Sequence, residues 1–311
     1  MRALVTGASG FVGPHLVARL KQDGYDVTGA GGPSESDPYL LPIDLADPPS
    51  LHAAFDIAAP SVVFHLAAQA FVPQAIQAPD DTYDINVMGT ARMLHALRLW
   101  RERTGGEARF VFVSSAEVYG RQPDSSCAID ETAALYPANP YAASKAAAEA
   151  IVRGEAQTFG VDAIIVRAFN HIGPGQSDRF VVSSFAAQLA AIAAGGEPVL
   201  RVGNVESKRD FLDVRDVVDA YAAVARWGAS GETYNVCSGV ATSIREILAE
   251  LIRIAHVPVE IREDPERMRP ADVPISYGNN AKLRAATGWS PRISLRSSLQ
   301  DIYRTAQMSR A

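Results

Sequence analysis

Short, continuous apolar runs recur along the first part of this chain. Each run is four to six residues long and rich in β-branched or aromatic side chains, which predicts a buried strand. The runs cover residues 2–6, 25–28, 61–66, 110–114 and 163–167. Because buried strands that alternate with helices indicate a parallel sheet covered on both faces, we predict an α/β fold.

The first helix is predicted from Phe11 to about Lys21. Val12, Leu16 and Leu20 recur at helical spacing and therefore fall on one face. Pro14 is compatible with this helix if it lies in the first turn, where its missing N–H costs no hydrogen bond. Residues 29–38 are rich in glycine, proline and serine, so they are predicted to form a loop after the second strand.

The strand–helix pattern weakens after Asn170, where Gly, Pro and Arg become frequent in residues 171–177 and 263–274. We interpret this part as a smaller second domain that shapes a pocket. Residues 213–236 return to the pattern of the sheet, so the boundary is predicted to be discontinuous. The predicted division gives residues 1–166 with 213–236 to the first domain, and residues 167–212 with 237–311 to the second.

Three glycines, Gly7, Gly10 and Gly13, join the first strand to the first helix. Glycines at this spacing permit a tight turn, close approach of a ligand to the backbone, and close packing of helix on strand. The helix N-terminus then offers N–H groups and a positive dipole end to a pyrophosphate. In this strand–loop–helix context the motif predicts a Rossmann doubly wound parallel sheet that binds a dinucleotide. A glycine turn without a ligand is the alternative.

The end of the second strand carries glycine and alanine at positions 29–32, with neither an acid nor an arginine. An acid there would bind a ribose 2′-hydroxyl and repel a 2′-phosphate. Its absence favours NADP(H) over NAD(H), although Glu35 and Asp37 could fold back and both cofactors stay open. Asp44 and Leu45 are predicted to lie near the adenine, and a helix N-cap is the alternative role for Asp44.

Tyr141 and Lys145 lie one helical turn apart and share a face. A neighbouring ammonium favours the phenolate and lowers the pKa of a tyrosine, which is ordinarily about 10. We therefore expect Tyr141 to exchange a proton with a substrate oxygen, with Lys145 also bound to the nicotinamide ribose. A solvated helix face is the alternative. Together with the glycine loop, the pair predicts nicotinamide redox chemistry at a carbonyl or hydroxyl carbon.

Two further polar residues follow the strand at residues 110–114. Ser115 is placed to hydrogen-bond the same substrate oxygen, and a strand-end cap is its alternative role. Glu117 could act on a carbon next to the carbonyl, or it could hold the loop in place. Ser115, Tyr141, Lys145 and Glu117 are therefore the candidate catalytic residues.

The composition excludes several other classes of function. Apolar residues make up 48% of the 311 residues and charged residues 21%, as in soluble globular enzymes. The net charge of −6 argues against nucleic-acid binding, and no apolar run approaches the roughly 20 residues that span a bilayer. Cys127 and Cys237 suggest neither a disulfide framework nor a metal site. A strand that begins at Arg2 leaves no room for a signal peptide, so we expect a cytoplasmic protein.

Four segments together resemble the extended short-chain dehydrogenase/reductases that modify nucleotide-diphosphate sugars. They are Thr6–Gly13, His65–Ala68, Ser114–Gly120 and the Tyr141/Lys145 pair. The resemblance covers essentially the whole chain and implies that Ser115, Tyr141 and Lys145 form the catalytic trio. It also implies that Asn86 stabilises a strand or faces the cofactor. The implied cofactor contacts are Gly7, Gly10, Phe11, Val12, Gly13, Leu66, Ala67, Ala68, Tyr141 and Lys145.

Residues 167–176, 203–211 and 269–273 are similar to segments of the GDP-mannose branch of this family. Arg209 and Arg269 could clamp a diphosphate through charge-assisted, forked hydrogen bonds, and a surface salt bridge is the alternative for each. Asp272 could accept a hydrogen bond from a ribose diol. The implied substrate-binding residues are Asn170, Phe180, Val181, Asn204, Arg209, Arg269 and Asp272.

The GDP-mannose branch contains a 4,6-dehydratase and a reductase of its keto-sugar product. The dehydratases usually begin with G-x-x-G-Q-D-G, carry Thr at the position of Ser115 and are longer, whereas residues 7–13 here are GASGFVG. Residues 204–221, 234–239 and 269–274 look most like the reductase that forms GDP-D-rhamnose, and Glu117 is compatible with both enzymes. The resemblance therefore implies NAD(P)H-dependent reduction of the C4 keto group of GDP-4-keto-6-deoxy-D-mannose.

Three alternatives stay open at this point: a GDP-mannose 4,6-dehydratase, a nucleotide-sugar 4-epimerase, and a dinucleotide-binding module without catalysis. The presence of Ser115, Tyr141 and Lys145 together argues against the last of these. Family analogy also implies a homodimer through helices near residues 84–99 and 141–158, where alanines would permit close packing. The expected partners are thus a GDP-sugar and a second copy of the chain, with no nucleic acid, membrane or metal.

Overall fold

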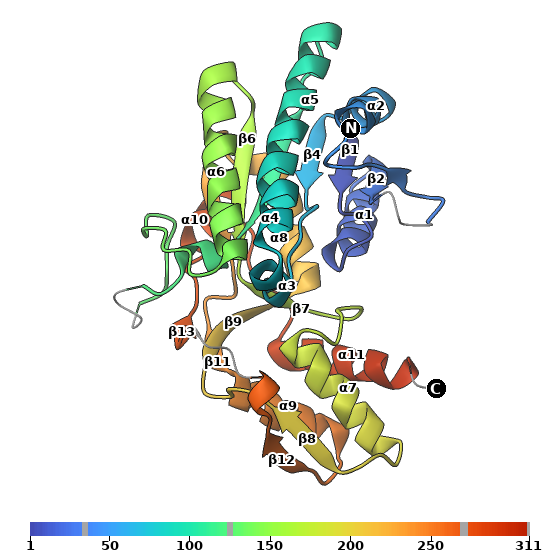
Figure 1. Cartoon of the computed structure of the whole chain (residues 1–311), viewed down its shortest axis with the longest axis vertical. Helices are drawn as coiled ribbons and strands as arrows, with labels where there is room; N and C mark the ends of the chain where they lie inside the picture. The colour runs from blue at the N-terminus through green and yellow to red at the C-terminus, as the bar shows by residue number, and fades with distance from the viewer. Residues whose placement is uncertain (33–36, 123–126, 268–272, 310–311) are drawn as a thin grey trace.

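The computed structural model describes residues 1–32, 37–122, 127–267 and 273–309. A seven-stranded sheet occupies the upper part of the molecule as drawn in Figure 1. Its strands are β1 (Arg2–Thr6), β2 (Asp26–Gly31), β3 (Leu41–Pro42), β4 (Val62–His65), β5 (Arg109–Ser115), β6 (Ala163–Ala168) and β10 (Thr233–Val236). All neighbouring pairs are parallel, and the order across the sheet is β10-β6-β5-β4-β1-β2-β3. This is the doubly wound Rossmann order, so the predicted fold class is confirmed.

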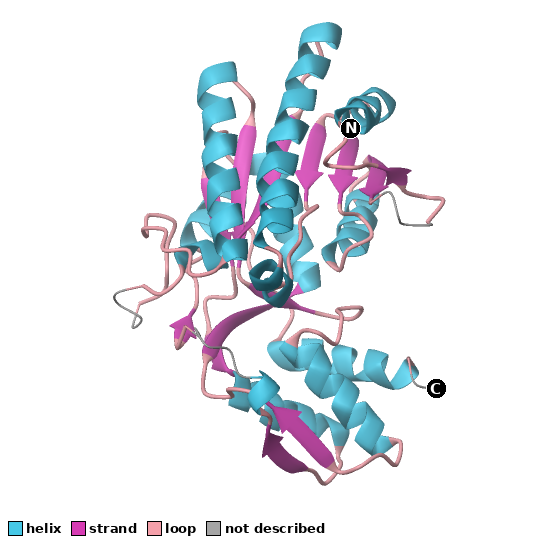
Figure 2. Cartoon of the chain, viewed as in Figure 1, coloured by secondary structure: helices cyan, strands magenta, loops and turns pink. Residues whose placement is uncertain are grey.

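Helices cover both faces of the large sheet (Figure 2). One face carries α1 (Val12–Gln22), α8 (Val214–Trp227) and α10 (Ala281–Thr287), around a core that includes Leu16 and Tyr221. The other face carries α2 (Pro48–Ala58), α5 (Gly89–Thr104) and α6 (Pro140–Phe159), around a core that includes Phe55 and Leu97. The strands are apolar along their length because both of their faces are buried in this way.

Four short segments link these elements at or near the sheet, and a fifth lies in the smaller part of the molecule. Before α5 come α3 (Val72–Gln77), α4 (Pro79–Tyr83) and a π-helical turn at Asp84–Met88. A 3-10 helix, Ala116–Tyr119, follows β5 directly, and another lies at Pro265–Arg267. Such π-helical turns occur often at functional sites, and this one contains Asn86.

The smaller part of the molecule lies below the sheet in Figure 1. Helices α7 (Val181–Ala193), α9 (Ile244–Ala255) and α11 (Leu295–Met308) pack around a separate apolar core. Strands β8 (Val199–Val202) and β12 (Glu260–Glu263) pair in parallel. Strand β9 (Lys208–Asp213) pairs with β7 (Asn170–Ile172), β11 (Ala241–Ser243) and β13 (Ile275–Ser276).

The chain thus leaves the large sheet after β6, returns to it with α8 and β10, and leaves it again. Leu283 and Trp289 also pack in the core of the large sheet, although they lie beyond residue 237. The exact ranges of the two domains stay a prediction.

One predicted segment is wrong in part. Residues 29–31, predicted as the start of a loop, belong to β2, where Gly29 is opposite Val5 of β1 and Ala30 is opposite Leu41 of β3. Glycine suits position 29 because a larger side chain would be crowded there: a Cβ would lie 2.9 Å from the Leu40 side chain and 3.1 Å from that of Ala8. Pairing with β1 and β3 keeps these residues in the sheet, and the local sequence pattern does not predict that pairing.

Within the described ranges, no helix combines the length and the apolar character needed to cross a membrane.

Candidate active site

The predicted chemistry converges on one edge of the large sheet, at the carboxyl ends of β1, β4 and β5. The glycine loop follows β1, residues 66–68 follow β4, and Ser115 ends β5. Helix α6, which carries Tyr141 and Lys145, packs against β5 and β6. In open α/β sheets the carboxyl edge is where ligands bind.

The glycine loop has no room for side chains at two of its positions. Gly7 has a φ of 69°, and a Cβ there would lie 2.8 Å from the backbone nitrogen of Ala67. A Cβ at Gly13 would lie 2.3 Å from the carbonyl oxygen of Ala8. The loop is closed by hydrogen bonds from Gly10 N to Gly7 O, at 3.1 Å, and from Gly13 N to Gly10 O, at 3.2 Å.

The N-terminus of α1 remains open to an anion. Phe11 is the N-cap residue and makes no side-chain hydrogen bond to the first turn, which contains no acidic residue. The ring of Phe11 instead stacks on His171 with 5.8 Å between ring centroids. The tight glycine cradle and this uncapped helix end fit the pyrophosphate of a dinucleotide.

Fewer of the residues predicted to lie near the adenosine of the cofactor can be described. No acid or arginine is present at Gly29–Gly32, and Glu35 lies outside the described residues. Asp37 accepts a hydrogen bond from Tyr39 N at 2.9 Å. The alternative role of Asp44 as a helix N-cap is wrong: Asp47 caps α2, while Asp44 accepts from Ala46 N at 2.8 Å.

Leu45, next to Asp44, packs against the start of α5. A Cβ at Gly89 would lie 3.0 Å from two carbons of the Leu45 side chain. The Leu45 carbonyl accepts a hydrogen bond from Arg92 at 3.2 Å. The half-buried pair Asp44 and Leu45 is thus held between β3 and α5, and its contact with adenine stays a prediction.

The hydroxyl of Ser115 lies close enough to Tyr141 to lower the pKa of its phenol. Hydrogen bonds to backbone N–H groups hold the segments that carry these two residues. Ser115 Oγ accepts from Glu117 N at 3.2 Å, and Asn139 caps α6, the helix of Tyr141, by accepting from Ala142 N at 2.8 Å. Ser115 therefore caps the strand end and also contacts Tyr141, so the two roles considered for it are compatible.

Lys145 is almost completely buried. Its Nζ donates to the carbonyl oxygen of Val113 at 2.8 Å and lies 5.1 Å from the centroid of the Phe112 ring. Burial lowers the pKa of Lys145 to about 8, against a smaller opposing effect of Glu149. The side chain is thus held against β5, one turn of α6 beyond Tyr141.

The expectation that Lys145 lowers the pKa of Tyr141 is wrong in this structure. Burial raises the pKa of Tyr141 to about 12, the nearby Glu117 carboxylate raises it further, and the hydrogen bond with Ser115 opposes both. Removal of water from the phenol outweighs the local charges, because a phenolate is poorly stabilised in an apolar environment. Tyr141 is therefore protonated at neutral pH.

Glu117 and Asn86 have well-defined surroundings. The exposed carboxylate of Glu117 accepts a hydrogen bond from the Asn139 side chain at 3.2 Å. Asn86 is buried; it accepts from Gln69 N at 2.8 Å and donates to Ser144 Oγ at 2.9 Å. Asn86 thus ties the loop after β4 to the helix of Tyr141 and Lys145.

The predicted substrate residues are only partly brought together. Asn170 on β7 is opposite Phe211 of β9, the strand that also carries the half-buried Arg209. Phe180 occupies the N-cap position of α7, whose first residue is Val181, and its ring lies edge-on to Phe71 with 6.2 Å between ring centroids. Asn204 accepts from Glu206 N within its own loop, at 3.0 Å. Arg269 and Asp272 lie outside the described residues.

A model of the family described as GDP-mannose 4,6 dehydratase matches residues 4–302. The chain belongs to the GDP-mannose 4,6 dehydratase family. It is 41% identical to GDP-6-deoxy-D-mannose reductase of Pseudomonas aeruginosa, over 97% of this chain and 95% of that protein. It is 34% identical to UDP-glucose 4-epimerase of Mycolicibacterium smegmatis, over 95% of both chains. The resemblance to the nucleotide-sugar-modifying short-chain dehydrogenase/reductases is thereby confirmed.

Solved structures of this dehydratase family and of its neighbours agree with the fold. The structure of RMD from Pseudomonas aeruginosa complexed with NADPH superimposes with a TM-score of 0.88 at 38% identity, and all of both chains are covered. UDP-glucose 4-epimerase of Thermus thermophilus in complex with NAD has a TM-score of 0.88 at 29% identity, over 99% of both chains. The chain is thus an enzyme of the oxidoreductase type predicted from its sequence.

This member of the dehydratase family contains polar groups near the site that were not among the predicted site residues. His65 is buried between Thr6 Oγ1, 2.8 Å from Nδ1, and Thr90 Oγ1, 3.2 Å from Nε2. Glu149 and Arg167 form a buried ion pair. In the sequence, the one signal of this ion pair was the position of Glu149, a single acid at helical spacing from Lys145 in an alanine-rich segment. Among the described residues, no cluster of His, Cys, Asp or Glu is arranged to hold a metal.

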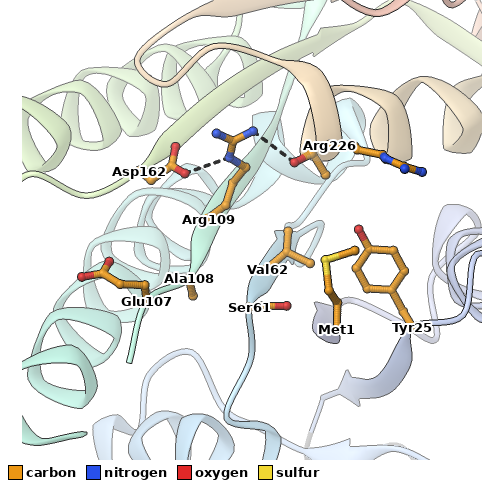
Figure 3. A pocket seen from close by; sticks show the side chains of 10 residues that line it. Met1, Tyr25, Ser61, Val62, Glu107, Ala108, Arg109, Asp162 and Arg226 are labelled. Carbon is orange, nitrogen blue, oxygen red and sulfur yellow. Dashed lines mark hydrogen bonds and ion pairs between the residues drawn. The ribbon is translucent and has the colours of Figure 1, made fainter. Parts of the chain in front are cut away.

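A separate cavity of about 340 Å³ lies at the opposite, amino-terminal edge of the sheet (Figure 3). Met1, Ser61, Arg109 and Asp162 are among its lining residues, and Arg109 Nε donates to Asp162 at 2.9 Å. None of the predicted site residues lines this cavity.

Proposed function

We propose that this enzyme reduces the C4 keto group of GDP-4-keto-6-deoxy-D-mannose to give GDP-D-rhamnose, with NAD(P)H as the reductant. One observation carries the proposal: Tyr141 lies beside Ser115 at the carboxyl end of β5, with Lys145 one turn further along α6 and held against Val113, and an open dinucleotide cradle follows β1 of the same sheet. The 41% identity to GDP-6-deoxy-D-mannose reductase, over 97% of this chain, supports the choice of substrate.

The protein's part in this reaction is proton transfer and stabilisation of charge. A bound nicotinamide cofactor would supply the hydride to C4. Tyr141 donates its phenolic proton to the oxygen on which charge develops, and Ser115 hydrogen-bonds the same oxygen. A phenol with a pKa of about 12 is fully protonated at pH 7, which is the state that reduction requires. Lys145 would hydrogen-bond the nicotinamide ribose of the bound cofactor.

The residues proposed to hold the cofactor are those of the glycine loop, residues 66–68, Asp44, Leu45, Tyr141 and Lys145. We favour NADP(H) because no carboxylate among the described residues stands at the end of β2 to repel a 2′-phosphate. The presence of NADPH in the Pseudomonas aeruginosa RMD structure supports this choice.

The proposed nucleotide-sugar contacts are Asn170, Phe180, Val181, Asn204 and Arg209, together with Arg269 and Asp272. In this arrangement residues 1–166 and 213–236 bind the cofactor, and residues 167–212 and 237–311 bind the substrate. A homodimer through α5 and α6 is part of the proposal, supported by the exposed apolar side chains of Ile85, Met88 and Leu99. A cytoplasmic location also stays a prediction.

A cofactor-oxidation assay tests the proposal. GDP-4-keto-6-deoxymannose is made in situ and supplied with NADPH or NADH, and the sugar product is identified by NMR. We expect stoichiometric oxidation of the cofactor and formation of GDP-D-rhamnose. Absence of oxidation would contradict the proposal.

The second candidate is a GDP-mannose 4,6-dehydratase, favoured by the exposed carboxylate of Glu117 close to Tyr141. That reaction needs an additional acid or base near C5 and C6 of the sugar. Conversion of GDP-mannose to the keto sugar by the same preparation, without net cofactor oxidation, would support this function and give Glu117 a catalytic role. Turnover of other nucleotide sugars without added cofactor would indicate an epimerase.

A further inference from the structure

A buried, forked ion pair lies next to the candidate catalytic residues. Arg167 on β6 donates from Nε to Oε1 of Glu149 at 2.9 Å, and from a terminal nitrogen to Oε2 at 2.7 Å. The side chains are only 4% and 0% exposed. Burial of two charges is costly, so such a pair is tolerated only where its geometry is good and further hydrogen bonds satisfy it.

Glu149 connects the strand of Ser115 to the helix of Tyr141 and Lys145. Its Oε1 accepts from Ser114 Oγ at 2.6 Å, and Ser114 directly precedes Ser115. Glu149 itself lies on α6, one helical turn beyond Lys145 and two turns beyond Tyr141. One carboxylate therefore links the two elements that carry the candidate catalytic trio.

The network continues through Arg167 to the return segment of the sheet. Arg167 donates to the hydroxyl oxygen of Tyr119 at 3.0 Å, and Tyr119 donates to Asn235 Oδ1 on β10 at 2.7 Å. Tyr119 ends the 3-10 helix that contains Glu117. The ends of β5, β6 and β10 are thus held together beneath the candidate site.

The charges around Lys145 come from three elements. On α6 lie Tyr141 and Glu149, and on β4 lies His65, whose pKa is lowered to about 3 by burial and by Lys145, so that it is neutral. Behind Glu149 stand Arg167 on β6 and Arg153 on α6, which also donates to Glu149 at 2.9 Å. Glu149 raises the pKa of Lys145, against the effect of burial.

We propose that Glu149 is a positioning residue for the proposed reaction: it holds Ser115 in register with Tyr141 and Lys145, and its negative charge keeps the Lys145 ammonium protonated. The inference rests on the proposed function in taking Tyr141 and Lys145 as the reacting pair. The protonation of Lys145 can be measured without any substrate.

The experiment is a pH titration of the lysine side chains by NMR. The chain contains four lysines, Lys21, Lys145, Lys208 and Lys282, so ¹³C labelling of the lysine ε-carbons gives four signals. The signal of Lys145 is assigned by its loss in Lys145→Met. In the unmodified enzyme we expect Lys145 to titrate near pH 8. In Glu149→Gln we expect its midpoint to fall by about one pH unit, with the other three unchanged.

Glu155→Gln is the matched control. Glu155 lies on the same helix, and its carboxylate is 2.9 Å from Nε of Arg98 on α5. The substitution removes one negative charge from α6 without touching the network, so the Lys145 midpoint should not move. A shift in Glu155→Gln as large as that in Glu149→Gln would overturn the inference.

A second variant keeps the test decisive if Glu149→Gln does not fold, since that change leaves Arg167 buried without a partner. In Glu149→Gln/Arg167→Met both charges are removed and the volume is largely retained. We expect a lowered Lys145 midpoint here too. An unchanged or raised midpoint in either folded variant contradicts the inference, because a purely structural role would leave the midpoint in place or, by admitting water to Lys145, raise it.

The kinetic counterpart is the alkaline limb of kcat/KM, which should move to lower pH together with the Lys145 midpoint. If the unmodified enzyme reduces the keto sugar but the Lys145 midpoint is insensitive to Glu149, only this inference fails. If the midpoint shifts but no keto sugar is reduced, the inference on Lys145 holds and the proposed function fails.

Discussion

The two edges of the large sheet contain similar groups in opposite environments. At the carboxyl edge, Glu149 and Arg167 form an ion pair that is almost fully buried. At the amino edge, Arg109 and Asp162 form a pair with 22% and 38% of their side chains exposed, beside the cavity of Figure 3. The difference teaches that a buried ion pair depends on a complete set of hydrogen bonds, whereas a partly exposed pair keeps water as a partner and contributes little.

The cavity itself does not identify the site. The amino edge has an open cavity but no predicted site residue, whereas the carboxyl edge combines an uncapped helix N-terminus with buried titratable groups. Buried titratable groups with perturbed pKa values, such as Tyr141 and Lys145, mark the carboxyl edge as the candidate site. Changes at the carboxyl edge should therefore alter the chemistry, and changes at the amino edge should not.

Replacement of Tyr141 by Phe should have the largest effect. Loss of the proton donor is expected to lower kcat by about 10²- to 10⁴-fold. Because the ring and its packing remain, the affinity for NADPH, measured by fluorescence titration, should be unchanged. Turnover at the level of the unmodified enzyme would show that Tyr141 is not the proton donor.

His65 should make the fold sensitive to acid. Burial lowers its pKa in the folded protein to about 3, below the ordinary value of about 6.5. The unfolded chain therefore binds this proton more tightly, so the stabilisation is fully present above pH 6.5 and is lost as the pH falls toward 3. The loss in free energy of unfolding is up to about 5 kcal/mol.

Urea unfolding at several pH values measures this effect. The comparison is with His65→Met, whose absolute stability will differ but whose slope between pH 6.5 and 4 should be shallower. Equal slopes for the two proteins would mean that His65 is not the group responsible.

Arg209→Ala should weaken substrate binding more than cofactor binding. Loss of a charge-assisted hydrogen bond to a diphosphate is expected to raise KM for the GDP-sugar by roughly 10- to 100-fold. Arg262→Ala is the control, because Arg262 is an exposed arginine on β12 paired with Glu260. Equal losses for substrate and cofactor in binding titrations would contradict the assignment of Arg209.

Asp162→Asn at the amino edge should have the smallest effect. A partly exposed ion pair contributes at most about 1 kcal/mol to the free energy of unfolding. We expect a loss within that limit by urea denaturation, and unchanged kcat and KM. A change in KM would show that the two edges are coupled and would break the contrast between them.

Patterns within a few residues of one another were sufficient for much of this protein. The spacing of Gly7, Gly10 and Gly13 and that of Tyr141 and Lys145 lie within single turns and helices, so the sequence alone determined the fold class and the main candidate residues. The apolar runs likewise predicted five strands of the large sheet, because a strand buried on both faces is mostly apolar.

Only the tertiary structure decided the rest. Residues 29–31 are held in β2 by their neighbours β1 and β3, and Asp47 rather than Asp44 meets the free N–H groups of α2. The pKa of Tyr141 is raised because other elements exclude water from it, and Glu149 meets Arg167 only once α6 packs on β6. Burial and long-range pairing depend on the whole fold, so the local spacing of residues does not predict them.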